Sequence, residues 1–182
     1  MAKIGLSGFK YALLTTEDPA TYDTPVVVGK AVSAKAAIDS NSAELYADNA
    51  LAESDSTFSK GKLTLETASL SKAVTAELLG HSLSGTAIVR KDNDIAPYVG
   101  IGRVITELVN GAYVYTAEFL SKVKFSEPAS DEKTKGASVD FATTSIEGTI
   151  SSLPSHEWSK SDSFATAALA SAFLDDCFGI ES

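Results

Sequence analysis

Two histidines are the residues of this chain best suited to acid–base chemistry near neutral pH. His81 follows Gly80 after a predicted helix end, where a solvated turn residue is expected, and His156 lies in a predicted loop. The two are far apart in sequence, and neither has a spacing that pairs it with a particular serine or cysteine. Because a triad needs a nucleophile, a base and an orienting carboxylate, the histidines do not predict a hydrolase.

The other candidate chemical groups also have ordinary structural explanations. Gly100-Ile101-Gly102 resembles the start of a dinucleotide-binding turn, but residue 105 is Ile105 instead of a third glycine, and a predicted strand continues where a helix should begin. Cys177, the single cysteine, lies on the apolar stripe of a predicted helix, which is typical of a small core residue. We therefore predict no enzymatic activity, no cofactor and no disulfide.

Charge and length exclude further classes of protein. The chain has 182 residues, with 15 Lys and Arg against 24 Asp and Glu and a net charge of -9. This balance argues against a protein that grips nucleic acid phosphates or an anionic membrane. No apolar run approaches the length of a membrane span, and the first residues do not resemble a signal peptide. We expect a soluble protein with one domain over residues 1–182, made in a reducing compartment.

Short-range patterns predict a mainly β fold with two helices. The stripe of Leu70, Val74 and Leu78 predicts a helix near 70–79, capped by Ser69 or Ser71 and ended by Gly80. A second helix is predicted near 162–178, with Ser161 as its cap and one apolar stripe. The members of that stripe are Ala165, Leu169, Phe173 and Cys177. Predicted strands cover 5–14, 26–38, 62–67, 95–109, 112–125 and 137–150.

The dipeptide Asn110-Gly111 predicts a tight hairpin, because both positions accept positive φ. The register set by that turn places Arg103 opposite Glu118 on one face of the hairpin. The other face then carries apolar residues, with Gly100 and Gly102 where Phe119 can cover them. The apolar residues are Val104, Leu108, Tyr113, Tyr115, Ala117 and Phe119.

Residues 39–56 form an acidic segment with five carboxylates and no cation. Their spacing matches no calcium loop, so we predict no metal site and interpret the segment as an extended acidic loop. Residues 126–136 are a second predicted polar loop, and residues 82–94 have no role that the sequence indicates.

Five patches, in this order and spacing, resemble a known family. They are Leu45-Tyr46-Ala47-Asp48-Asn49, Pro97-Tyr98-Val99-Gly100-Ile101-Gly102, Leu120-Ser121-Lys122-Val123-Lys124-Phe125, Thr134-Lys135-Gly136 and Ile146-Glu147-Gly148-Thr149-Ile150. With the two predicted helices, they resemble the major tail protein, or tail tube subunit, of long-tailed (siphovirus) bacteriophages and related prophages. The resemblance covers roughly residues 1–178.

The resemblance implies a β-sandwich or flattened barrel that self-assembles into hexameric rings. The rings would stack into a hollow tube that passes DNA during infection. Implied partners are other copies of the chain, a tape-measure protein in the lumen, and tail terminator and distal tail proteins at the tube ends. DNA would pass without tight binding, and no membrane is involved. The implied location is the virion tail tube, assembled in the host bacterial cytoplasm.

Subunit contacts are expected in the acidic segment, since a long loop in this family resembles the contact between stacked rings. The candidates are Leu45, Tyr46, Asp48, Leu51 and Glu53, with Lys122 and Lys124 as cations that could meet Asp48 or Glu53. The sequence leaves two alternatives open. One is the tube subunit of a phage-like particle, such as a tailocin or gene-transfer particle, and the other is a monomeric immunoglobulin-like binding module.

Overall fold

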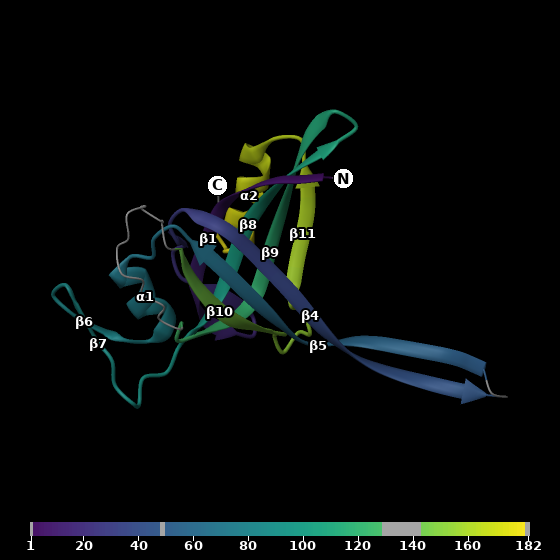
Figure 1. The fold of residues 1–182 in the computed structure, drawn as a ribbon, viewed down its shortest axis with the longest axis horizontal. Helices are drawn as coiled ribbons and strands as arrows, with labels where there is room; N and C mark the ends of the chain where they lie inside the picture. Colours follow the sequence, from purple (N-terminus) through teal and green to yellow (C-terminus); the bar gives the residue numbers. More distant parts are fainter. Residues whose placement is uncertain (1, 48–49, 129–142, 181–182) are drawn as a thin grey trace, which may run out of the picture.

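The computed structural model describes residues 2–47, 50–128 and 143–180. In this part of the chain, five strands precede the first helix, six more follow it, and the second helix comes last (Figure 1). The strands are β1 (Ala2–Glu17), β2 (Ala20–Tyr22), β3 (Val26–Val27), β4 (Ala31–Ala47), β5 (Ala50–Thr67), β6 (Ser82–Ser84), β7 (Ala87–Val89), β8 (Tyr98–Val109), β9 (Ala112–Ser126), β10 (Thr144–Ser151) and β11 (Ser159–Phe164). The helices are α1 (Lys72–Leu79) and α2 (Ala167–Cys177). The prediction of a mainly β fold with two helices is confirmed.

One large antiparallel sheet holds most of these strands, in the order β2-β1-β8-β9-β10-β5-β4. The far edge of β9 is shared, because β11 pairs with its first half and β10 with its second half. Arg103 of β8 donates from Nη1 to the carbonyl oxygen of Ala34 in β4 at 2.8 Å, so β4 packs across β8 as in a sandwich. The described strands do not close into a barrel, which leaves the sandwich of the two predicted architectures.

The β8–β9 hairpin has the predicted turn and register. Asn110 and Gly111 have φ of 51° and 82°, and Arg103 pairs with Glu118, donating from Nε to Oε2 at 2.6 Å. Gly102 lies opposite Phe119, as predicted, although the side chains nearest to Gly102 come from α2. The expected burial is wrong at the tip, because Leu108 and Tyr113 are 40% and 59% exposed. The hairpin extends past the end of α2 that could have covered them (Figure 1).

Two apolar cores lie on opposite faces of the sheet. The larger core gathers β1, β5, β8, β9 and β10 around α1, whose Val74, Leu78 and Leu79 are buried in it. Ser71 caps α1 by accepting from the backbone N–H of Val74, and Gly80 ends it with φ 73°. The predicted cap, stripe and stop of this helix are therefore confirmed.

The smaller core lies between α2 and the other face of β1, β8 and β9. Its helix residues are Ala170, Leu174 and Phe178, which differ by one position from the predicted stripe. The predicted stripe is wrong at Leu169, which is 54% exposed, whereas Phe173 and Cys177 do pack against the edge of this core. The helix also begins later than predicted, at Ala167, and the hydroxyl of its cap Thr166 accepts from the Leu169 N–H. The predicted first residues of the helix instead form β11 along the edge of β9.

The acidic segment also differs from its prediction. Residues 39–47 and 50–56 are paired strands of the β4–β5 hairpin and not a loop, with residues 48–49 outside the described part. Backbone hydrogen bonds between strands can order a polar ribbon even when apolar and polar residues do not alternate along it. Such a ribbon has no two-residue period from which its strands could be predicted. Predicted strand residues 137–142 and predicted loop residues 129–136 also lie outside the described part.

Candidate functional site

The β4–β5 hairpin projects from the body of the molecule as a long two-stranded ribbon (Figure 1). Near its base, β5 also pairs with β10, from Thr67 opposite Thr144 to Gly61 opposite Ile150. We call residues 39–47 and 50–60, beyond that last pair, the outer ribbon. Within the described residues no third strand pairs with the outer ribbon. An isolated two-stranded ribbon is at best marginally stable in water, so this region is suited to stabilisation by a partner.

Aromatic packing fixes the base of the ribbon to the body. The ring of Phe58 in β5 stacks on Trp158, with centroids 4.8 Å apart and an angle of 4° between the planes. Trp158 is itself held, because its carbonyl oxygen accepts from the backbone N–H of Ser121 at 3.0 Å. A Cβ at Gly61 would lie 2.9 Å from Ile38 and 3.1 Å from Ile150, so a glycine is needed where these side chains close over the strand. The direction of the ribbon is therefore set by packing at its base.

The predicted contact residues of the acidic segment lie toward the tip of the outer ribbon. In the backbone ladder Leu45 pairs with Glu53 and Tyr46 with Leu51. Asp48 lies outside the described residues, as do the side chains of the other four. The structure therefore brings Leu45, Tyr46, Leu51 and Glu53 together at one end of the molecule, and their role in contacts stays a prediction.

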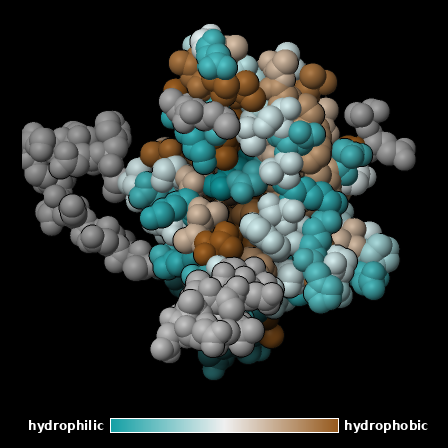
Figure 2. Space-filling view, turned by 90° about the vertical axis from the view of Figure 1, so that its right-hand side faces the viewer, coloured by the Kyte–Doolittle hydropathy of each residue, from teal (hydrophilic) through white to brown (hydrophobic). Residues whose placement is uncertain are grey.

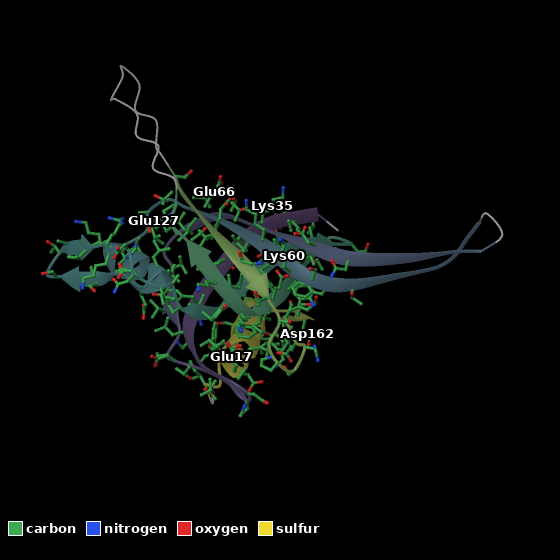
Figure 3. The ribbon with its side chains drawn as sticks, turned by 90° about the horizontal axis from the view of Figure 1, so that it is seen from below. Glu17, Lys35, Lys60, Glu66, Glu127 and Asp162 are labelled. Atoms are coloured by element: carbon green, nitrogen blue, oxygen red, sulfur yellow. The ribbon has the colours of Figure 1, made fainter. Side chains whose placement is uncertain are left out.

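The two predicted cations, Lys122 and Lys124, lie on β9 and belong to a larger set. Cross-strand partners share a face, so the register of β9, β10, β5 and β4 places one row of lysines on the solvent side of these strands. We call this surface the lysine face; Figure 3 shows two of its members, Lys35 and Lys60, together with Glu66. Its lysines are Lys35, Lys60, Lys62, Lys122 and Lys124.

Some of these lysines already have partners within the chain. Lys122 lies 2.7 Å from a carboxylate oxygen of Glu17, and its Nζ lies 4.3 Å from the centre of the Tyr98 ring. Lys124 lies over the same ring at 5.2 Å. Lys62 pairs with Glu147 at 2.8 Å, with both side chains more than half exposed. The exposed pair is weak in water, so Lys62 can exchange Glu147 for a carboxylate of another molecule at little cost.

The residues considered for catalysis are not brought together. Within the described part of the chain, no three His, Cys, Asp or Glu side chains are placed to hold a metal ion. Cys177 is half-buried, and burial raises the pKa of its thiol, which disfavours the reactive thiolate. His156 is exposed in the loop before β11. In the described segments, no helix has the length and hydrophobicity that crossing a bilayer requires.

His81 differs from its prediction as a solvated turn residue. Its side chain is only 8% exposed and lies between the carboxylates of Asp94 and Glu127. Sequence reasoning missed this cluster because the three residues are separated by 13 and 46 positions and come from unrelated segments. No short-range pattern connects them.

Comparison with known proteins gives no assignment. Neither the scan against protein-family models nor the search of curated proteins finds a match to this chain.

Proposed function

We propose that this chain is the structural subunit of the tail tube of a long-tailed bacteriophage. In this proposal it self-assembles into hexameric rings that stack into a hollow tube in the virion, through which DNA passes during infection. The observation that carries the proposal is the outer ribbon, which extends beyond the body and pairs only with itself in the described structure. A subunit of an ordered polymer gains the missing contacts from its neighbours.

The positions of the family-like patches support this proposal. Three of the five fall on β8, β9 and β10, which are neighbouring strands, and residues 45–47 of a fourth lie at the outer end of β4. The fifth, residues 134–136, lies outside the described part. The resemblance thus concerns the centre of the sheet and the projecting ribbon rather than scattered surface positions.

The distribution of charge supports contacts between copies. The outer half of the ribbon sequence carries Glu44, Glu53 and Asp55 without a cation, and at the base of the ribbon Asp39 lies opposite Lys60. The lysine face has five lysines and, by the same register, also Glu66 and Glu147. Opposite charges on two surfaces of one chain favour contact between successive copies and fix its direction. The net charge of -9 also suits a conduit, because a wall that attracted phosphates would retain DNA.

Electron microscopy of the purified protein over a range of concentrations tests the proposal. We expect rings or tubes at high concentration, and we expect a variant lacking residues 41–54 to remain monomeric. The deletion removes only ribbon backbone beyond the Phe58–Trp158 stack, so circular dichroism of the deletion variant should still show a folded, mainly β protein.

Two outcomes would contradict the proposal. Monomers at every concentration would favour an immunoglobulin-like binding module, and normal tubes from the deletion variant would exclude the outer ribbon as the contact. Tubes from the parent chain fit a phage tail and a phage-like particle equally. The presence of a DNA-filled capsid on particles from the producing cells separates those two cases.

A further inference from the structure

A charged cluster joins three segments at the end of the molecule opposite the outer ribbon. His81 directly follows the residue that ends α1, Asp94 lies before β8, and Glu127 follows β9. Nδ1 of His81 lies 2.7 Å from Oδ2 of Asp94, and Nε2 lies 2.8 Å from Oε2 of Glu127. Figure 3 shows Glu127 on the side of the molecule that carries α1, β6 and β7. Both ring nitrogens of one imidazole therefore face carboxylate oxygens.

This arrangement requires a particular protonation state. A neutral imidazole has one N–H, so it can donate to only one of the two carboxylates, and its second nitrogen would direct a lone pair at the other. An imidazolium donates from both nitrogens, and each bond is then charge-assisted. The geometry fits the imidazolium. In agreement, hydrogen bonds to Asp94 and Glu127 raise the pKa of His81 above its ordinary value.

Each of the two carboxylates that face His81 also accepts a hydrogen bond from a second donor. Asp94 also accepts from the backbone N–H of Lys91 at 2.9 Å, and Glu127 accepts from Nε of Arg90 through its other oxygen at 2.8 Å. The side chain of Asp94 is 12% exposed and that of Glu127 is 49% exposed. The charged side chains that face His81 are thus two carboxylates, with Arg90 behind one and Lys91 beside the other.

The cluster holds a segment that has few other attachments. His81 and Asp94 bracket residues 82–93, which contain the β6–β7 hairpin, and none of these residues is buried. We call residues 82–93 the excursion. Lys72 of α1 donates to the carbonyl oxygen of Thr86 at 3.1 Å, and Gly80 packs against the backbone of Ile95. The side-chain bonds from the excursion and His81 to the end of β9 run through Glu127.

We propose that protonated His81 is a clasp that ties the excursion to the end of β9, and that loss of its proton releases Glu127. Asp94 is the better buried carboxylate and has the Lys91 N–H as a second donor, so it retains the remaining imidazole proton. The hydrogen bond between His81 and Asp94 then remains, while the bond between His81 and Glu127, at the end of β9, breaks. The excursion stays tied to α1 through Lys72 and Thr86, but its side-chain link to the end of β9 is lost. This device operates in the single chain and does not depend on the proposed function.

The chain contains one other residue of each type that the test follows, and this second residue serves as an internal control. Its only histidines are His81 and His156, and its only arginines are Arg90 and Arg103. Nuclear magnetic resonance titration of the full monomeric chain can therefore follow the His81 ring and the Arg90 Nε–H separately. Nε of Arg103 donates to Glu118 in the sheet, away from the clasp, and serves as the reference signal.

We expect the His81 midpoint to lie above 6.5, its ordinary value, and the Arg90 Nε–H signal to change with the same midpoint. The Arg103 signal should stay constant over this range. Glu127→Gln should lower the His81 midpoint, because it removes one of the two carboxylates. Glu147→Gln, a glutamate of nearly equal exposure paired with Lys62, is the matched control and should leave the midpoint unchanged.

Two results would overturn the proposal. The first is a His81 midpoint at or below 6.5, since the two carboxylates would then not favour the imidazolium. The second is an Arg90 Nε–H signal that stays constant while His81 titrates, since Glu127 would then keep its place without the proton. Because Glu127 is half-exposed, its glutamine variant should fold, and signal dispersion in the same spectra verifies this.

Discussion

The two longest hairpins of the molecule are built from strands of similar length but differ in what surrounds them. The β8–β9 hairpin is covered by the larger core on one face and by α2 on the other, and its Ile101, Ala117, Phe119 and Leu120 are at most 1% exposed. The outer ribbon of β4 and β5 leaves the body and has no third strand among the described residues. The backbone hydrogen-bonding pattern is the same in both.

In terms of the proposed function, the β8–β9 hairpin serves folding and the outer ribbon serves assembly. Burial of apolar side chains is the main favourable term in folding, so the β8–β9 hairpin carries stability. The outer ribbon adds hydrogen bonds that water can replace, and so it adds little. Substitutions in the first region should change the free energy of unfolding. If the proposed function is correct, substitutions around the second should change contacts between copies.

Phe119→Ala should have the largest effect on stability. Phe119 is 1% exposed and packs edge to face on Tyr22 and Phe178, with ring centroids 5.3 and 5.0 Å away. We expect a loss of about 3–5 kcal/mol in unfolding free energy, measured by urea denaturation. Tyr113→Ala, on the same face of the same strand but 59% exposed, is the control and should cost about 0.5 kcal/mol or less. Equal losses would contradict the assignment of stability to the covered part of the hairpin.

Gly111→Ala should have the next largest effect. The residue has φ 82° in the β8–β9 turn, and an L side chain in this region costs about 1–2 kcal/mol. Gly85→Ala has similar strain, with φ 62°, in the turn of the exposed excursion. Urea denaturation should show the full loss for Gly111→Ala, whereas for Gly85→Ala hydrogen exchange should show opening of residues 82–93 alone. If Gly85→Ala shifts global unfolding as much, the excursion belongs to the cooperative core.

Part of the dependence of stability on pH should come from the clasp. The raised pKa of His81 makes its contribution fully present below pH 6.5 and lost as pH rises through the raised value. Hydrogen bonds from His81 lower the pKa values of Asp94 and Glu127 from 3.8 and 4.5, so their contributions are lost as pH falls through the lowered values.

Unfolding midpoints measured from pH 3 to 9 should therefore pass through a maximum between roughly pH 4.5 and 6.5. Glu127→Gln should flatten both sides of that maximum, because it removes one partner of the imidazolium. The variant lacking residues 41–54 should keep the same profile. A profile that flattens in the deletion variant would mean that the ribbon carboxylates take part in folding.

Lys62→Ala should have the smallest effect on folding. Its exposed pair with Glu147 is worth between about 0 and 1 kcal/mol. If the lysine face meets the acidic ribbon of another copy, the variant should still raise the concentration needed for tubes, measured by sedimentation. Added salt should raise that concentration for the parent chain, because the screening length falls from about 10 Å at 0.1 M to about 3 Å at 1 M. Assembly that is independent of both would exclude this charge contact.

The parts of the fold that could be predicted are those in which the turn or capping residues and the pattern of apolar residues indicate the same structure. Asn110-Gly111 fixes the turn of β8–β9, and alternation of apolar residues along both arms fixes the register. Ser71 and Gly80 similarly mark the ends of α1. Each of these signals lies within a few residues of the feature that it predicts, and tertiary contacts strengthen it.

The remaining elements depend on contacts that the sequence does not display. The strand β11 is mostly polar, and its order comes from pairing with the edge of β9. The sequence around α2 has two overlapping apolar stripes. The stripe that faces Gly102 is the more buried one, because Leu174 and Phe178 fill the space above that glycine. The candidate site was partly predictable: the acidic segment was singled out by its charge, but its strand structure and the lysine face follow from register alone.

Because Phe58 stacks on Trp158, tryptophan fluorescence reports on the base of the ribbon. Trp158 is the single tryptophan of the chain, so its emission spectrum has one source, and that source lies where the ribbon joins the body. An indole that loses its aromatic neighbour and meets water emits at longer wavelength. The unlabelled protein therefore carries its own fluorescent reporter of structural change where the ribbon joins the body.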